Sequence, residues 1–249
     1  MLFFNIENSI LFLRIGSGLV PFASHKICSY NWKKKFANEL KGIGEYVKKN
    51  KIRISMHPDQ FVVINSRDKE IVEKSIKEIE YHCDLLDIMG LDAQAKVQIH
   101  VGGVYNEKEK SIERFIKKYL KLNLKIKKRL VVENDHLSYS LKDCLYINKK
   151  TGIPVVFDTY HHECLNNGES FKEAVEKASL TWKRKDGLLM VDYSNGSLAK
   201  KIGSHAESID ISAFRKFLQT TRKFDFDIML ELKDKEKSAL KALKIIMGQ

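Results

Sequence analysis

The chain alternates short apolar runs with longer charged segments over nearly its whole length. Apolar runs of strand length occur at 11–16, 52–57, 96–101, 130–135, 154–158, 187–193 and 226–231. Segments with helical spacing of apolar residues occupy 33–50, 68–89, 107–127, 140–150, 169–183, 211–222 and 234–247. Unbroken Val/Ile/Leu runs are typical of parallel strands that helices cover on both faces. Strand–helix alternation therefore predicts an α/β fold of the TIM-barrel type with right-handed crossovers.

The length and the strand count bear on how the barrel is completed. A chain of 249 residues with three prolines and no Gly/Ser-rich linker is expected to form one domain over residues 1–249. A closed (β/α)8 barrel needs eight strands, whereas the pattern gives seven. The chain opens on FFNIENSI, which resembles the end of a helix. Either the barrel is incomplete at its N-terminus or one strand escapes the pattern.

Neither a membrane protein nor a secreted protein is indicated. No apolar stretch approaches the roughly 20 residues that a membrane span needs. The apolar N-terminus contains Glu7 and Asn8 and has no basic leader, which argues against a signal peptide. The four cysteines lack metal-finger or CxxC spacing. We therefore expect reduced thiols and a cytoplasmic location.

Five of the apolar runs end in a residue type that binds metal ions. These residues are His57, His100, Glu133, Asp158 and Glu231. The carboxyl ends of parallel barrel strands meet at one face, where the chemistry of such barrels is built. Mixed imidazole and carboxylate ligands suit manganese, zinc or iron, and a buried carboxylate needs a cation or a hydrogen-bond partner. The sequence predicts a metal site ringed by strand ends.

Other histidines differ in how well they fit this site. His161 follows Asp158 by three residues as the chain enters the next loop, so both can reach one cavity. His205 and His25, in loops, would complete the set. His82 in mid-helix and His136 in a polar loop are expected to be ordinary core or surface residues. His162 is left open, because adjacent residues cannot easily face one metal ion.

The net charge of +12 and the pI near 9.3 have two interpretations. They suggest a polyanionic partner, but lysines on solvated helix faces give the same excess.

Several words of the sequence resemble the ultraviolet damage endonuclease family. They are RIGSGLVPFASH (14–25), MHPDQFVVINS (56–66), IHVGGVYNEKEKSIERF (99–115), LVVENDHLSYSLKDCL (130–145), GIPVVFDTYHH (152–162), GSHAESID (203–210) and MLELKDKE (229–236). They cover nearly the whole chain in order and are specific jointly, although each alone is weak. The resemblance implies a TIM barrel with about three divalent metal ions, usually manganese. It also implies double-stranded DNA with ultraviolet lesions as the partner, nicked immediately 5′ of the photoproduct to leave a 3′-hydroxyl and a 5′-phosphate.

The resemblance also assigns roles at the metal site. The metal ligands it implies are His57, His100, Glu133, Asp158, His161, His205 and Glu231, with His25 near the cluster. The site would hold two or three ions, and Glu133 would bridge two of them. A lysine, Lys233, would add positive charge near the scissile phosphate or lie on the outer rim.

A second set of residues is implied to contact DNA. Gln60 and Phe61 match a glutamine–aromatic pair that is inserted into the duplex where the damaged dinucleotide is flipped out. The alternative is that Phe61 only begins the buried run FVVI. Tyr105, after a Gly-Gly turn, is a second candidate for stacking on a base or sugar.

Two features depart from the family pattern. LLMVDYSNG places Met190 and Asp192 where relatives carry a lysine and a histidine, so Asp192 is the expected ligand there and activity is less certain. Relatives also begin with a further strand and most of a helix, so the chain is expected to lack the first strand and part of the first helix. An open barrel exposes strand edges and is expected to be less stable or to associate across the gap.

Three alternatives to a lesion-specific nuclease stay open. A metal-dependent sugar isomerase or epimerase uses the same ligand types on a related barrel. An apurinic-site endonuclease shares the metal chemistry but not the lesion. Met190, Asp192 and the missing strand also allow a non-catalytic DNA-binding relic.

Overall fold

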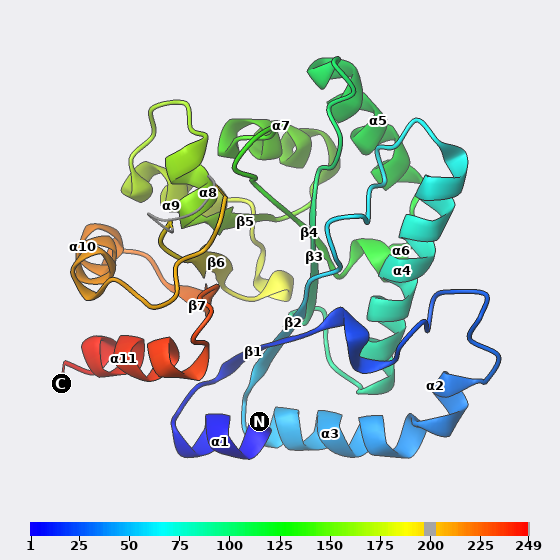
Figure 1. Cartoon of the computed structure of the whole chain (residues 1–249), viewed down its shortest axis with the longest axis horizontal. Helices are drawn as coiled ribbons and strands as arrows, with labels where there is room; N and C mark the ends of the chain where they lie inside the picture. Colours follow the sequence, from blue (N-terminus) through cyan, green and yellow to red (C-terminus); the bar gives the residue numbers. More distant parts are fainter. Residues whose placement is uncertain (197–202, 249) are drawn as a thin grey trace.

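The computed structural model describes residues 1–196 and 203–248 (Figure 1). Within these ranges seven parallel strands lie side by side in sequence order. They are β1 (Phe12–Ile15), β2 (Arg53–Met56), β3 (Lys96–His100), β4 (Leu130–Glu133), β5 (Val155–Asp158), β6 (Leu189–Tyr193) and β7 (Phe226–Leu230). Each strand lies inside one of the seven apolar runs, and the prediction of an α/β fold of the TIM-barrel type is confirmed.

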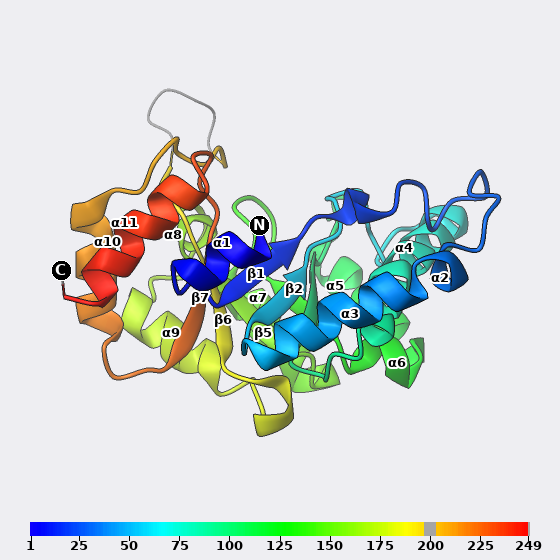
Figure 2. The ribbon, with the colours of Figure 1, turned by 90° about the horizontal axis from the view of Figure 1, so that it is seen from below.

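Helices connect successive strands and cover the outside of the sheet (Figures 1 and 2). The longer ones are α3 (Ala37–Lys49), α4 (Lys69–Ile88), α5 (Lys108–Lys121), α7 (Leu141–Thr151), α9 (Phe171–Ser179), α10 (Ile211–Thr221) and α11 (Glu236–Ile246). The short ones are α1 (Leu2–Glu7), α2 (Trp32–Lys35), α6 (Leu124–Lys127), α8 (Thr159–Cys164) and the 3-10 turns η1 (Ser17–Leu19) and η2 (Arg184–Asp186). Side-chain caps begin several of them: the Asp68 carboxylate accepts from the Glu70 amide at α4, for example.

Two helices that the periodicity predicts as continuous are interrupted. The segment 33–50 forms α2 and α3, which meet at Phe36, where the backbone leaves helical geometry. The segment 107–127 forms α5 and α6, because Leu122 is extended and the Asn123 side chain caps a new helix. Apolar spacing continues through such breaks, so periodicity alone does not reveal them.

Residues of each strand alternate between the barrel interior and the helices outside. Val131, Val156 and Met190 form a small interior cluster with the partly buried Phe12. Their sequence neighbours, such as Val132 and Val155, pack outward in the main hydrophobic core. Since side chains alternate with a period of two, residues two positions further along point into the same interior at the carboxyl ends of the strands. This alternation is what brings the strand-end residues together.

The sheet is not closed by hydrogen bonds between β1 and β7 in the described residues. Side chains bridge this open side instead. At the amino end of the strands, Arg53 of β2 donates to the Asp227 carboxylate of β7 at 2.6 Å and to the Leu188 carbonyl at 2.8 Å. At the other end, Arg14 of β1 pairs with Glu231, just after β7. The seven-stranded barrel is therefore nearly closed, and α1 lies between α3 and α11 beside the opening (Figures 1 and 2).

No helix in residues 1–196 or 203–248 combines the length and the apolar character that crossing a membrane requires. All four cysteines lie in this part of the chain and are free thiols.

Candidate metal centre

Strand register places the predicted ligands opposite one another. His100, the last residue of β3, is the partner of Glu133, the last residue of β4. Asp158, the last residue of β5, is the partner of Asp192 on β6. Because neighbouring parallel strands lie about 4.8 Å apart, residues paired in this way and pointing inward have side chains within contact distance.

The described residues contain three groups whose ligand atoms could share a metal ion. The first ligand group is His57, His100 and Glu133; the second is Glu133, Asp158 and His161; the third is Asp158, Asp192 and Glu231. Within each group the ligand atoms lie within 4.8 Å of one another. Glu133 and Asp158 each belong to two groups, so the three groups form one continuous cluster.

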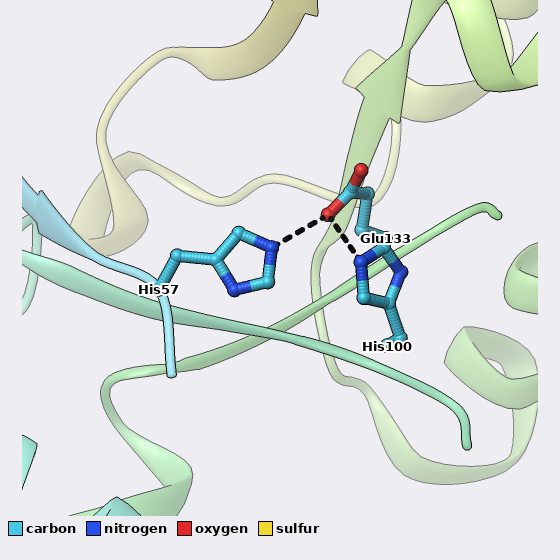
Figure 3. Close-up of side chains that lie close together, drawn as sticks. All are labelled: His57, His100 and Glu133. Carbon is cyan, nitrogen blue, oxygen red and sulfur yellow. Dashed lines mark ion pairs between the residues drawn. The ribbon is translucent and has the colours of Figure 1, made fainter. Parts of the chain in front are cut away.

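Glu133 lies at the centre of this cluster. Its Oε2 atom lies 3.3 Å from Nε2 of His57 and 3.6 Å from Nε2 of His100. Figure 3 shows both rings directing this nitrogen at the same carboxylate oxygen. Two ligand atoms each about 2.1 Å from one tetrahedral ion lie about 3.4 Å apart. The spacing of the first ligand group therefore fits a shared ion better than a direct hydrogen bond.

The other oxygen of Glu133 faces His161. Its Oε1 atom lies 3.0 Å from Nδ1 of His161. Burial raises the pKa of Glu133, but the surrounding imidazoles outweigh burial and hold this pKa well below its usual value. Burial lowers the pKa of His161, whereas the carboxylates of Asp158 and Glu133 raise it, with a net result of about 10. The Glu133 carboxylate thus keeps its charge in the barrel interior through its hydrogen bonds and electrostatic interactions with these imidazoles.

Asp158 fixes the position of His161. The residues after Asp158 are helical and not a loop as expected, because α8 begins at Thr159. The Asp158 carboxylate caps this helix by accepting from the backbone amide of His161 at 2.6 Å. One turn of helix therefore carries His161 back over the strand end. The three-residue spacing between Asp158 and His161 is therefore that of one helical turn capped by Asp158. The pattern of apolar residues does not indicate this turn.

The third ligand group contains a positive charge supplied by the chain. Arg14, on β1, donates to Oδ1 of Asp192 at 2.7 Å and also pairs with Glu231. Burial raises the pKa of Asp192 to about 7, although Arg14 acts in the opposite direction. His205 lies beside this group, with Nε2 at 3.5 Å from Oε2 of Glu231.

The cluster fits a divalent cation on its own chemistry. Nitrogen and carboxylate oxygen are the donors that manganese and zinc accept. Among the described residues, Oδ2 of Asp158 and Nδ1 of His57 and of His100 are buried without a hydrogen-bond partner. Burial raises the pKa of Asp158 well above its usual value, as expected for a carboxylate that lacks sufficient compensating charge. A metal ion bound to this carboxylate would supply that charge.

Other histidines lie outside the three groups. His25 is exposed in the turn after η1, and its Nδ1 accepts from the backbone amide of Ile27. His162 points away from the cluster, because its Nε2 lies 2.8 Å from the Glu169 carbonyl. His136 was expected to be an ordinary loop residue, but it lies beside the cluster. The centroid of its ring is 5.2 Å from that of the His161 ring. His82 is buried in α4, as its mid-helix position suggests.

Lys233 follows Glu231 by two residues in the chain. Its side chain is 38% exposed, and Nζ lies 3.9 Å from a carboxylate oxygen of Glu207. Whether Lys233 adds charge near the scissile phosphate or lies on the outer rim stays a prediction.

The expected DNA-contacting residues lie on loops that follow the strands. Gln60 is exposed, and Phe61 is 67% exposed, so the alternative that Phe61 begins a buried run is wrong. The buried run begins at Val62, which is 4% exposed. Tyr105 has a positive φ of 53°. The guanidinium groups of two arginines lie 5.5 and 5.3 Å from its ring centroid, and these are Arg67 and Arg114.

Two residues that contact the cluster, Gln98 and Arg14, are not among those predicted from the sequence. Gln98 donates from Nε2 to Oε2 of Glu133 and to Oδ2 of Asp192, both at 2.5 Å. Arg14 donates to Oε1 of Gln98 at 3.0 Å. The available signal was a polar residue inside an otherwise apolar strand. Gln98 precedes His100 by two residues and therefore shares its face of the sheet.

Fold and site together define a class: a TIM-type barrel with a histidine–carboxylate cluster at the carboxyl ends of its strands. The family model described as UV-endonuclease UvdE matches residues 1–247. The chain belongs to this family.

Known proteins agree with this assignment. The chain is 45% identical over 241 residues to the UV DNA damage endonuclease of Clostridium perfringens, covering 96% of the chain and 58% of that protein. The chain thus spans little more than half the length of this relative. The crystal structure of SacUVDE matches with a TM-score of 0.94 at 49% identity, covering 99% of this chain and 83% of that one. The structure of endonuclease IV from Thermus thermophilus matches with a TM-score of 0.65 at 17% identity, covering 99% of this chain and 91% of that one. At this identity the match shows only a shared fold.

Proposed function

We propose that the chain is a metal-dependent DNA endonuclease that hydrolyses the phosphodiester 5′ to ultraviolet photoproducts in duplex DNA. One observation carries the proposal: Glu133 is buried among three histidines at the strand ends of a chain in the UV-endonuclease UvdE family. Cellular DNA repair is the process in which such a cut would be used.

The cofactor we propose is a set of two or three divalent ions, with Mn²⁺ favoured by the mixed donors. The ligands are the members of the first and second ligand groups, together with Glu231 and His205. His25 would join only if its turn moved, because it is exposed and outside the groups of the described residues. When bound, such ions activate a water molecule as the nucleophile and neutralise charge on the phosphate.

Glu133 would act as the central ligand. Its two oxygens face different histidines, with Oε2 towards His57 and His100 and Oε1 towards His161. Glu133 would therefore hold the metal together with these histidines. Lys233 would add positive charge where the DNA backbone approaches.

DNA recognition would involve both charge and a side-chain wedge. A net charge of +12 favours binding to the phosphate backbone. The exposed ring of Phe61, next to Gln60, could fill the space left by a flipped dinucleotide and offset part of an unstacking cost of a few kcal/mol. The guanidinium groups of Arg67 and Arg114 already flank the ring of Tyr105. Tyr105 would therefore hold these arginines beside the DNA backbone more readily than it would stack on a base.

The free state of all four cysteines supports a reducing, cytoplasmic location. Whether copies associate across the open side between β1 and β7 stays a prediction.

The test is a nicking assay on irradiated and non-irradiated duplex with protein stripped of metal by a chelator. We expect nicks only in irradiated DNA, only after Mn²⁺ is restored, and none with the His100→Ala variant at unchanged thermal stability. Nicking of duplex with abasic sites but not of irradiated duplex would identify an apurinic-site endonuclease. Binding without any nicking would identify a non-catalytic relic, and turnover of a ketose without DNA binding would identify an epimerase.

A further inference from the structure

The third ligand group differs from the other two in how its oxygen atoms are used. Both carboxylate oxygens of Asp192 accept short hydrogen bonds, Oδ1 from Arg14 at 2.7 Å and Oδ2 from Gln98 at 2.5 Å. One oxygen of Glu231 is paired with Arg14 as well. In the first ligand group, by contrast, Oε2 of Glu133 faces Nε2 of His57 and of His100 and accepts from the neutral amide of Gln98. An ion could enter the first ligand group without displacing a positively charged guanidinium, whereas Arg14 already occupies the third.

Arg14 is held firmly in this position. It comes from β1, its side chain is only 15% exposed, and it donates to a neutral partner, Oε1 of Gln98, in addition to the two carboxylates. Burial lowers the pKa of Arg14, but the carboxylates around it raise it further, so the guanidinium stays charged. A permanent cation in contact with two carboxylates repels a divalent ion and occupies the oxygens that would bind it.

We propose that Arg14 is the resident cation of the third ligand group, and that Asp192 serves as its counter-ion and not as a metal ligand. The inference rests on the proposed function, because it concerns the metal centre of that function. It assigns Arg14 as a positioning residue: by taking Oε1 of Glu231, it leaves Oε2 facing His205 at 3.5 Å. Glu231 can thus still bind an ion on the side of His205.

Met190 is consistent with this arrangement. It lies two residues before Asp192 on β6, is fully buried, and packs in the apolar interior cluster with Val131 and Val156. It therefore brings no carboxylate or imidazole to the third ligand group, and the only charge that β6 adds there, Asp192, is already matched by Arg14.

The experiment counts Mn²⁺ ions per chain by elemental analysis after equilibrium dialysis, for four forms of the full chain. The forms are wild type, Asp192→Asn, Arg14→Gln and the double variant. We expect Asp192→Asn to bind as many ions as wild type, with an unchanged dissociation constant. Arg14→Gln leaves the carboxylates of Asp192 and Glu231 without their cation and should bind one additional ion, and the double variant should return to the wild-type count. Exposed residues of the same types, Asp225→Asn and Arg222→Gln, serve as matched controls.

Two outcomes would overturn the inference alone: loss of an ion in Asp192→Asn, or an unchanged count in a folded Arg14→Gln. If Arg14→Gln does not fold, as judged by thermal melting, the Asp192→Asn measurement decides by itself. Absence of Mn²⁺ from the wild type at saturating concentration would contradict the proposed function and this inference with it.

Discussion

Glu133 carries its charge in a fully buried position, 1% exposed, because three imidazoles face it. Removing that charge leaves the histidines without a common anion and removes the ligand that two groups share. Replacing Glu133 should therefore weaken metal binding more than replacing any single histidine of the cluster.

The Glu133→Gln variant should bind Mn²⁺ more than about 100-fold more weakly than wild type, since even residues that only orient ligands contribute about 10- to 100-fold. Isothermal titration calorimetry measures the affinity. Glu113→Gln, the same change at an exposed position of α5, should behave as wild type. Equal affinities for Glu133→Gln and wild type would remove Glu133 from the metal centre.

Phe61 makes a separate prediction, because its exposure puts it outside the core. Phe61→Ala should leave the melting temperature and Mn²⁺ affinity unchanged while weakening binding to irradiated duplex by about 1–3 kcal/mol, the contribution of one aromatic–base stack. Phe61→Tyr keeps the aromatic face and should restore binding. Fluorescence anisotropy gives both affinities; an Ala variant that discriminates irradiated from intact duplex as wild type does would exclude the wedge.

Among the elements, α4 and β4 are joined by one buried arginine. Arg129, immediately before β4, is 0% exposed and donates to the Asp87 carboxylate near the end of α4. It also donates to backbone carbonyls of the α4–β3 connection, including those of Leu91 and Ala95. This contact lies at the amino end of the strands, so it should affect stability and not the metal centre.

Asp87→Asn should lower the free energy of unfolding by about 1–3 kcal/mol at neutral pH, the cost of removing one partner of a charged hydrogen bond. Burial raises the pKa of Asp87, but Arg129 and Lys128 together lower it more, so the folded pKa lies below the unfolded value. This contribution is therefore present above about pH 4 and is lost as the pH falls through the folded pKa. Urea unfolding of both forms from pH 7 to pH 3 measures it; a difference that grows towards low pH would contradict this assignment.

The positions of the strands and of the strand-end ligands could be predicted because each depends on local periodicity. Apolar runs mark buried strands, and the last inward residue of each run reaches the cavity, as His100 and Glu133 do. The partners of Asp192 could not be predicted in this way. Arg14 and Gln98 are 178 and 94 residues away in sequence, and only closure of the sheet brings them to its carboxylate. The helix α8 could not be predicted for a different reason. Its start depends on one capping carboxylate, that of Asp158, and not on the spacing of apolar residues.

At the scale of the whole molecule, the open side between β1 and β7 leaves two strand edges without a hydrogen-bonded neighbouring strand among the described residues. Two arginines bridge it, Arg53 to Asp227 and Arg14 to Glu231. Arg53 also packs on aromatic rings, with its guanidinium 5.6 Å from the ring centroid of Phe12 and 5.3 Å from that of Trp182. Side chains therefore do part of what an eighth strand does in a closed barrel.

Arg53→Met keeps an apolar stem between those rings but loses the bonds across the opening. We expect the free energy of unfolding to fall by about 1–3 kcal/mol, because the Asp227 carboxylate and the Leu188 carbonyl lose a charged donor. We also expect association to increase with concentration as the strand edges become accessible. Chemical unfolding and sedimentation velocity measure the two effects, with Arg222→Met as a surface control; identical behaviour of Arg53→Met and the control would show that the opening does not limit stability.

A duplex that carries one defined photoproduct allows the position of the cut to be mapped. Metal-stripped protein is incubated with end-labelled duplex, with and without Mn²⁺, and the fragments are resolved at single-nucleotide resolution. We expect a single cut immediately 5′ of the lesion that depends on Mn²⁺ and is absent with Glu133→Gln. The cut should leave a 3′-hydroxyl that a polymerase can extend. Cutting without Mn²⁺, cutting at undamaged positions, or no cutting by a protein loaded with Mn²⁺ would contradict the proposed function.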